Sequence, residues 1–140
     1  MKTKLTFLLL FLVGFLFAQQ LNSELNCAKF KTGKFELQND ETGLYFIITR
    51  TDNHQVEETY SLDRTKKLKD DAFFYVEWVD DCTYLLFLDR ETNEGDEWDS
   101  YVDAKGGLKT EIIETNNNCY LAETTFEDFL IQSVLCKMEE

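Results

Sequence analysis

The chain has 140 residues and a formal net charge of −13 at pH 7, because 27 acidic side chains outnumber 14 basic ones. Nucleic-acid binding depends on Lys and Arg side chains that displace counterions from phosphates, so this composition excludes nucleic acid as an expected partner. We expect partners that are neutral, cationic or bridged by a metal. Solubility alone also accounts for such a charge.

The first residues have the layout of a secretory signal peptide. Two lysines precede an apolar run at residues 5–17, and the small Ala18 ends that run. The run is shorter than the roughly 20 residues that a transmembrane helix needs. We predict a signal peptide over residues 1–18 and a single secreted β domain over residues 19–140, periplasmic or outside the cell. No transmembrane segment is expected after cleavage.

The hydrophobic pattern of the remaining chain has a period near two, and some runs, such as residues 72–79 and 82–88, are apolar on both faces. Such patterns are typical of β-strands with both faces at least partly covered. Strands are predicted at residues 44–50, 54–62, 72–79, 82–88 and 108–114. Turn-forming residues such as Asn, Asp and Gly separate these segments. Two charged stretches, residues 63–71 and the acidic residues 89–99, are predicted as longer loops.

The alternation in residues 54–62 also predicts which side chains face solvent. Val56 and Tyr60 lie on one face of this segment, and Gln55, Glu57 and Thr59 lie on the other. Because the second face is polar throughout, we expect it to be the one in contact with water.

Strands with short turns between them predict an all-β antiparallel meander of about seven to nine strands. A flat meander leaves long exposed edges, so closure into a small barrel or half-barrel is favoured. The C-terminal segment has two interpretations. A β-hairpin turning at Glu127-Asp128 is favoured, and the alternative is a short helix with Thr124 and Glu127 as its capping box.

The four cysteines are Cys27, Cys82, Cys119 and Cys136. An even number of cysteines behind a signal peptide predicts two disulfides. In the hairpin register Cys119 lies opposite Cys136, at a spacing that a disulfide tolerates. Cys27 and Cys82 would then form the second bond, while the other two connectivities stay open.

Three motifs follow one another in the secreted part. They are N-C-x-x-F-x-T-G-x-F at residues 26–35, W-x-x-D-C-x-Y at 78–84 and I-x-x-T-x-x-N at 112–118. In these motifs, and in Arg50 and Glu58 between them, the chain resembles small exported bacterial proteins of unknown function. Many of those proteins carry a DNA topoisomerase IV label that looks like an annotation error.

The resemblance covers most of residues 26–137 and implies an obscure function on a lipocalin-like architecture. Members with two cysteines match at Cys27 and Cys82. The resemblance therefore supports a bond between these two, with Cys119 and Cys136 as an added local cross-link.

Aromatic side chains inside a small barrel either fill its core or line a ligand cavity. We predict a non-enzymatic binding or interaction module for an unknown small molecule or protein. Its possible cavity lining is Phe46, Tyr60, Phe74, Trp78 and Phe87. The alternatives are a small secreted hydrolase, which requires two carboxylates converging in a cleft, and a structural protein of the cell envelope.

No catalytic, cofactor-binding or metal-binding residue is assigned, and the oligomeric state stays open. His54 is the single histidine, and no nucleophile with an orienting carboxylate surrounds it in the sequence. The acidic residues 89–99 offer oxygen ligands of the kind that calcium prefers. Gly95 stands at the seventh position of this stretch and not at the sixth, as an EF-hand loop requires, so we expect a solvated loop.

Overall fold

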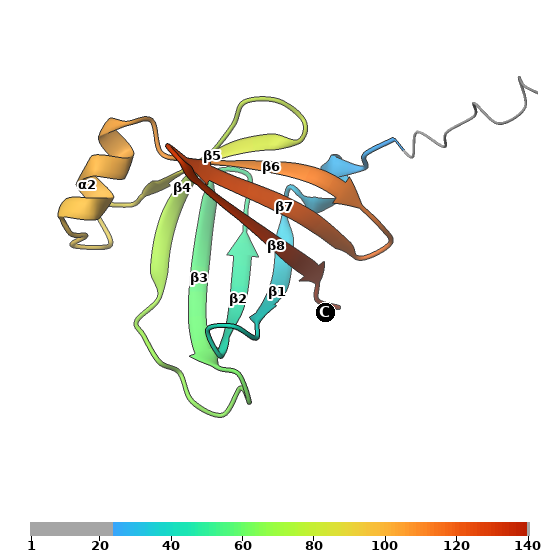
Figure 1. Cartoon of the computed structure of the whole chain (residues 1–140), viewed down its shortest axis with the longest axis horizontal. Helices are drawn as coiled ribbons and strands as arrows, with labels where there is room; N and C mark the ends of the chain where they lie inside the picture. The colour runs from blue at the N-terminus through green and yellow to red at the C-terminus, as the bar shows by residue number, and fades with distance from the viewer. Residues whose placement is uncertain (1–23, 140) are drawn as a thin grey trace, which may run out of the picture.

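The computed structural model describes residues 24–139, and the predicted signal peptide at residues 1–18 lies outside them. Eight antiparallel strands form a closed barrel in which each strand pairs with the next and β8 returns to β1 (Figure 1). The strands are β1 (Gly33–Asn39), β2 (Leu44–Arg50), β3 (His54–Ser61), β4 (Ala72–Trp78), β5 (Thr83–Leu88), β6 (Leu108–Thr115), β7 (Cys119–Phe126) and β8 (Phe129–Lys137). This is the predicted all-β meander, closed in the up-and-down manner of lipocalins.

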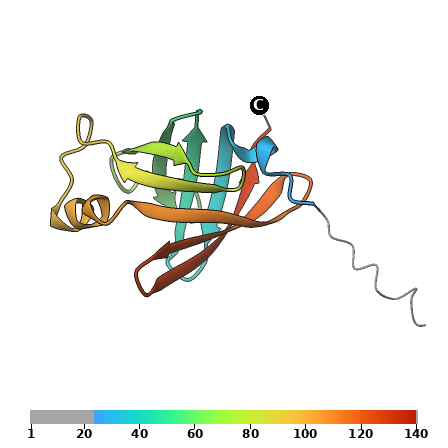
Figure 2. The same cartoon turned by 90° about the horizontal axis from the view of Figure 1, so that it is seen from above.

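Two short helices accompany the barrel. The 3-10 helix η1 (Cys27–Phe30) precedes β1, and α2 (Glu97–Ala104) lies between β5 and β6. Figures 1 and 2 show these helices on opposite sides of the barrel. The prediction of a loop throughout residues 89–99 is therefore wrong at its C-terminal end.

A reciprocal cap explains why α2 begins there. The Asp99 backbone N–H donates to the Asp96 carboxylate at 3.0 Å, and the Asp96 backbone N–H donates to the Asp99 carboxylate at 2.8 Å. This pair satisfies two backbone donors that a helix start otherwise leaves free. The capping-box motif usually has Glu or Gln at its last position, where this chain has Asp99. The helix start was therefore not recognised among the many acidic residues of this segment.

The C-terminal segment is the predicted hairpin, and the helical alternative is wrong. β7 pairs with β8 from Cys119 opposite Cys136 to Phe126 opposite Phe129. The turn falls at Glu127 and Asp128, where Glu127 adopts a left-handed backbone with φ of 50°. The continuous ladder leaves no backbone groups free for a helix in this segment.

Both predicted disulfides are present. Cys119 is bonded to Cys136 within the β7–β8 hairpin, with 4.0 Å between Cα atoms. Cys27 is bonded to Cys82, with 5.2 Å between Cα atoms. The second bond ties η1 to the turn between β4 and β5, so it fastens the start of the domain to the middle of the sheet.

The helix η1 closes one end of the barrel. Phe30 is completely buried, and its ring centroid lies 5.0 Å from that of Tyr120 and 6.5 Å from that of Phe35. Ile112 and Leu135 complete this part of the core, which is packed against the Cys27–Cys82 bond. The main hydrophobic core therefore lies at the closed end.

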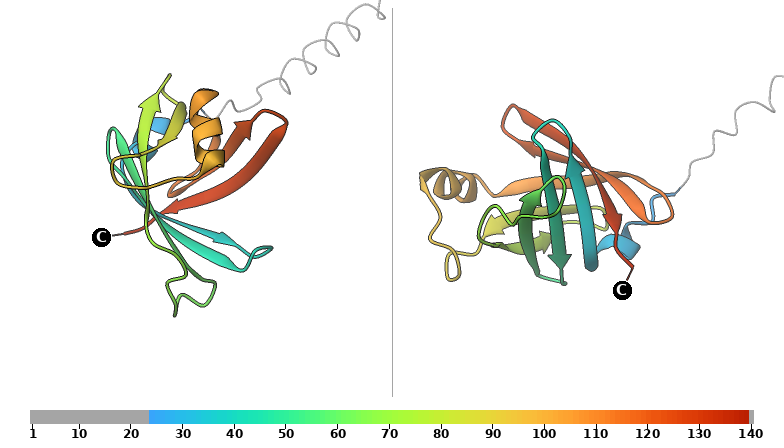
Figure 3. Two further views of the ribbon diagram at one scale, coloured as in Figure 1. Left: turned by 90° about the vertical axis from the view of Figure 1, so that its left-hand side faces the viewer. Right: turned by 90° about the horizontal axis from the view of Figure 1, so that it is seen from below.

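The barrel is joined loosely where β8 meets β1. Only two residue pairs link these strands, Phe35 with Lys137 and Glu36 with Cys136. Beyond them the tip of the β7–β8 hairpin points away from the β1–β2 turn (Figure 3). Large apolar side chains on this part of β8 are exposed, including Phe129 and Ile131.

The predicted orientation of β3 is wrong. Gln55 and Thr59 are only 2% and 7% exposed, and together with Glu57 they lie on the inner face of the barrel. The register fixes this orientation, since Gln55 lies opposite the buried Arg50 of β2 and shares its face. The polar side of β3 points inward because the interior itself contains a charged group.

Removal of the two disulfides should cost different amounts of stability. Closing a loop restricts the unfolded chain more when the loop is longer, and the sequence separations are 55 residues for Cys27–Cys82 and 17 for Cys119–Cys136. We expect a loss of about 4 kcal/mol for Cys27→Ser with Cys82→Ser and about 3 kcal/mol for Cys119→Ser with Cys136→Ser. Urea denaturation measures both, and a larger loss from the hairpin pair would contradict this assignment.

Candidate functional site

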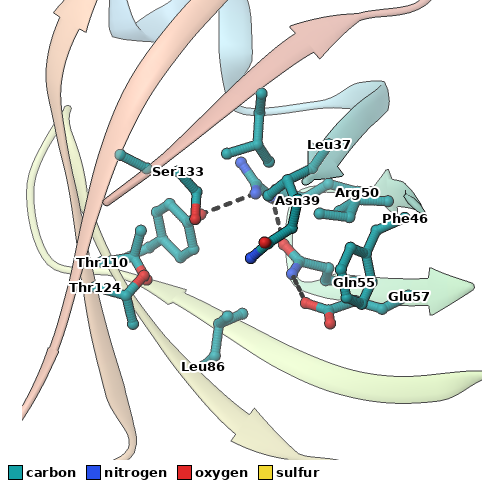
Figure 4. A pocket seen from close by; sticks show the side chains of 14 residues that line it. Leu37, Asn39, Phe46, Arg50, Gln55, Glu57, Leu86, Thr110, Thr124 and Ser133 are labelled. Atoms are coloured by element: carbon teal, nitrogen blue, oxygen red, sulfur yellow. Dashed lines mark hydrogen bonds between the residues drawn. The ribbon is translucent and has the colours of Figure 1, made fainter. Parts of the chain in front are cut away.

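A cavity of about 240 Å³ lies inside the barrel (Figure 4). We call it the inner cavity. Its apolar lining consists of Leu37, Phe46, Ile48, Leu86, Ala122 and Leu135. Its polar lining consists of Asn39, Arg50, Gln55, Glu57, Tyr84, Thr110, Thr124 and Ser133. This lining is mixed, and cavities that combine apolar walls with placed polar groups are typical of small-molecule sites.

Arg50 is the central polar group of the lining. Its side chain is 2% exposed and donates four hydrogen bonds within the protein. The guanidinium reaches the Phe30 carbonyl oxygen at 3.2 Å, the Tyr84 hydroxyl at 2.9 Å and the Tyr120 hydroxyl at 3.1 Å. Since a guanidinium has five N–H donors, little of its bonding capacity is left for a ligand.

Two hydrogen bonds link Arg50 to the amide of Gln55 and that amide to the carboxyl group of Glu57 in the cavity lining. Arg50 Nε donates to Gln55 Oε1 at 2.7 Å, and Gln55 Nε2 donates to Glu57 Oε1 at 2.7 Å, as Figure 4 shows. Glu57 and Arg50 therefore do not touch directly. The Gln55 amide relays between the buried cation and the carboxylate.

Burial favours the neutral forms of Glu57 and Tyr84. Burial raises the pKa of the Glu57 carboxyl, an effect that the hydrogen bond from Gln55 and the charge of Arg50 oppose only in part. Burial likewise raises the pKa of the Tyr84 hydroxyl, although the Arg50 charge lowers it. Tyr84 thus stays protonated at neutral pH, while Glu57 holds its proton to higher pH than an exposed glutamate.

The five aromatic residues predicted as cavity lining lie in different places. Phe46 lines the inner cavity. Trp78 packs on Tyr84 in the core, with ring centroids 4.8 Å apart. Phe74 lines a separate hollow of about 40 Å³ beneath α2.

Tyr60 and Phe87 lie away from the inner cavity. Tyr60 packs against Tyr45 with ring centroids 6.5 Å apart, and its hydroxyl donates to Glu58 at 2.9 Å. Phe87 lies opposite Tyr75 on the face that alternates with the inward Leu86. A prediction based on large aromatic residues did not find the polar lining residues. Which side chains point inward depends on how each strand's alternation is aligned with the barrel interior.

The structure gives no special role to the histidine or to the acidic segment. The exposed His54 ring contacts the Asn53 side chain at 2.8 Å and packs on Tyr75. In residues 24–139 no group of three or more His, Cys, Asp or Glu side chains is arranged to hold a metal ion. The same residues contain no helix long and apolar enough to span a membrane.

Fold and cavity together define the class of this chain as an eight-stranded lipocalin-like barrel with a polar group set into its interior. No protein-family model, curated protein or solved structure matches the chain. The resemblance to small exported bacterial proteins therefore stays a prediction from the motifs.

Loss of the Arg50 side chain should destabilise the barrel. In Arg50→Met the Gln55, Tyr84, Tyr120 and Phe30 oxygens all lose a buried donor. We expect a loss of about 3 kcal/mol or more for this variant and about 1 kcal/mol for Tyr120→Phe, which removes one bond. Urea denaturation with equal midpoints for Arg50→Met and wild type would contradict the proposed network.

Glu57 should make stability depend on pH. Because its folded-state pKa lies above the ordinary value of 4.5, the stability it contributes is complete below that value and is lost as pH rises through the raised pKa. Glu57→Gln should therefore gain melting temperature relative to wild type as pH increases from about 4 to about 8. The exposed Glu111→Gln, on β6, controls for removal of a negative charge. Parallel pH curves for Glu57→Gln and wild type would contradict the burial of this carboxyl.

Proposed function

We propose that this chain is a secreted, non-enzymatic binding protein that holds a small molecule inside its barrel. The observation that carries the proposal is the inner cavity of about 240 Å³, which combines apolar walls with a fixed polar group. A barrel that served only as a structural unit would gain stability from filling this space, since interiors pack densely.

The unused hydrogen-bonding capacity around the inner cavity supports the same proposal. Glu57 accepts one hydrogen bond, from Gln55, through only one of its two carboxylate oxygens. Ser133 lines the cavity, and its hydroxyl makes no hydrogen bond with any of the described residues. Polar groups that line a cavity and have unused hydrogen-bonding capacity are suited to orient a ligand.

The arrangement of carboxylates favours binding over hydrolysis. Hydrolysis of a glycan by paired carboxylates needs an acid and a second carboxylate within roughly 5 to 9.5 Å. Among the described residues that line the inner cavity, Glu57 is the single carboxylate. A single carboxylate supports a binding site and not the acid and base pair of a hydrolase.

The proposal that the protein is exported is based on the signal-peptide-like sequence of residues 1–18. The two disulfides support it, because disulfides persist in oxidising compartments. An envelope-associated structural protein would share these features. Such a protein would not need the inner cavity, so ligand binding in that cavity distinguishes the two functions.

Filling the inner cavity should weaken binding without unfolding the barrel. Ser133 lines the cavity, whereas its neighbour Val134 points outward and is 56% exposed. With the neutral fluorophore N-phenyl-1-naphthylamine as probe, we expect saturable fluorescence enhancement by wild type and by Val134→Trp. Ser133→Trp should weaken binding by about tenfold or more, which corresponds to about 1.4 kcal/mol.

Circular dichroism is the control for folding, and we expect both tryptophan variants to give the spectrum of wild type. Native mass spectrometry of protein purified from its own host provides a second readout, because a bound molecule adds its mass to the intact chain. Probe binding that is absent from wild type, or equally strong in Ser133→Trp, would overturn the proposal.

A further inference from the structure

A second hollow adjoins the inner cavity, and we call it the outer cavity. It has a volume of about 300 Å³. Its lining comes from α2, β6 and the β7–β8 hairpin: Trp98, Leu108, Thr124, Phe126, Phe129 and Ile131. All of these side chains except Thr124 are apolar, in contrast to the mixed lining of the inner cavity.

Several apolar side chains of the outer cavity are exposed, and one of them, Trp98, packs on a buried ring. Trp98 is 53% exposed, Phe129 66% and Ile131 56%. The Trp98 ring packs edge-on against Phe126 with ring centroids 5.4 Å apart, and Phe126 is itself buried. Exposed apolar side chains that gather around a hollow mark binding grooves, whereas scattered ones do not.

The two cavities are neighbours, because Thr124 lines both of them. The inner cavity contains the ionisable groups Arg50, Glu57 and Tyr84, and the outer cavity contains none. A molecule that occupies both would meet a polar environment at one end and an apolar environment along the rest of its length.

The polar end is suited to a donor of hydrogen bonds and not to an anion. Arg50 already donates four hydrogen bonds to protein oxygens and is 2% exposed. Glu57 is less buried than Arg50, and one of its carboxylate oxygens accepts no hydrogen bond from the described residues. An ammonium group brings three donors and a compensating positive charge to this carboxylate.

We infer that the ligand is an amphipathic primary amine, with its ammonium group at Glu57 and its apolar body in the outer cavity. This inference rests on the proposed function, since it names the chemical class of the molecule held in the barrel. The net charge of −13 acts in the same direction, because it attracts cations from solution.

The test uses octylamine, 1-octanol and octanoate, which share one alkyl chain and differ only in head group. Isothermal titration calorimetry at neutral pH measures the affinity of each for wild type. We expect octylamine to bind about tenfold more tightly than octanoate or better, a difference of about 1.4 kcal/mol, with 1-octanol in between.

Two variants separate the contributions of head group and chain. Glu57→Gln should reduce the preference for octylamine to about threefold or less, whereas the exposed Glu111→Gln should retain it. Trp98→Ala should weaken all three ligands by similar factors, because they share the alkyl chain that the outer cavity contacts.

The outcomes distinguish this inference from the proposed function. Octanoate binding as tightly as octylamine, or a preference for octylamine that survives Glu57→Gln, would overturn the amine assignment. In that case, binding of N-phenyl-1-naphthylamine that is weakened by Ser133→Trp would still support a small-molecule barrel. Absence of binding by that probe and by all three octyl compounds would overturn both.

Discussion

The buried guanidinium of Arg50 is the interaction on which the rest of this barrel depends. It bonds the carbonyl oxygen of Phe30 in η1, the amide of Gln55 in β3 and the hydroxyls of Tyr84 and Tyr120 in β5 and β7. A charge in an apolar interior is tolerated only when its donors are satisfied. The elements that carry those acceptors must therefore meet around one point, which fixes how η1 closes the barrel and which face of each strand points inward.

The polar interior follows from this one residue. Gln55 lies opposite Arg50 in the β2–β3 register, and Glu57 lies one inward position further along the strand. Gln55 bonds both of them, so its amide links the buried guanidinium of Arg50 to the carboxyl group of Glu57. The inner cavity remains open because short polar side chains occupy inward positions, among them Thr110, Thr124 and Ser133. In a solid core, larger apolar side chains fill such positions.

Local sequence patterns predicted much of the fold and little of the site. The strand at residues 44–50 and the C-terminal hairpin with its Cys119–Cys136 bond agree with the structure, because turn residues and side-chain alternation act over short distances. The Cys27–Cys82 bond spans 55 residues and was predicted as the remaining pair, with support from the resemblance. The phase of β3 was wrong, since alternation separates two faces without saying which is covered. Gln55 and Glu57 face inward only because of Arg50, a partner on another strand. The arginine at the end of the largely apolar segment 44–50 was the available signal.

The two ends of the barrel differ in the number of interactions that hold them together, and this difference is compatible with the proposed binding function. The Cys27–Cys82 bond, the fully buried Phe30 and the Arg50 network all lie at the closed end. Both residue pairs between β1 and β8 also lie near this closed end, so in the opposite part β8 has no paired residue on β1 and the β7–β8 hairpin has exposed apolar side chains. Regions with few buried contacts open locally at lower free energy than the core does. A ligand that enters beside this hairpin would gain apolar contacts there while the rigid end keeps Glu57 in position, so binding need not disturb the cross-linked part of the fold.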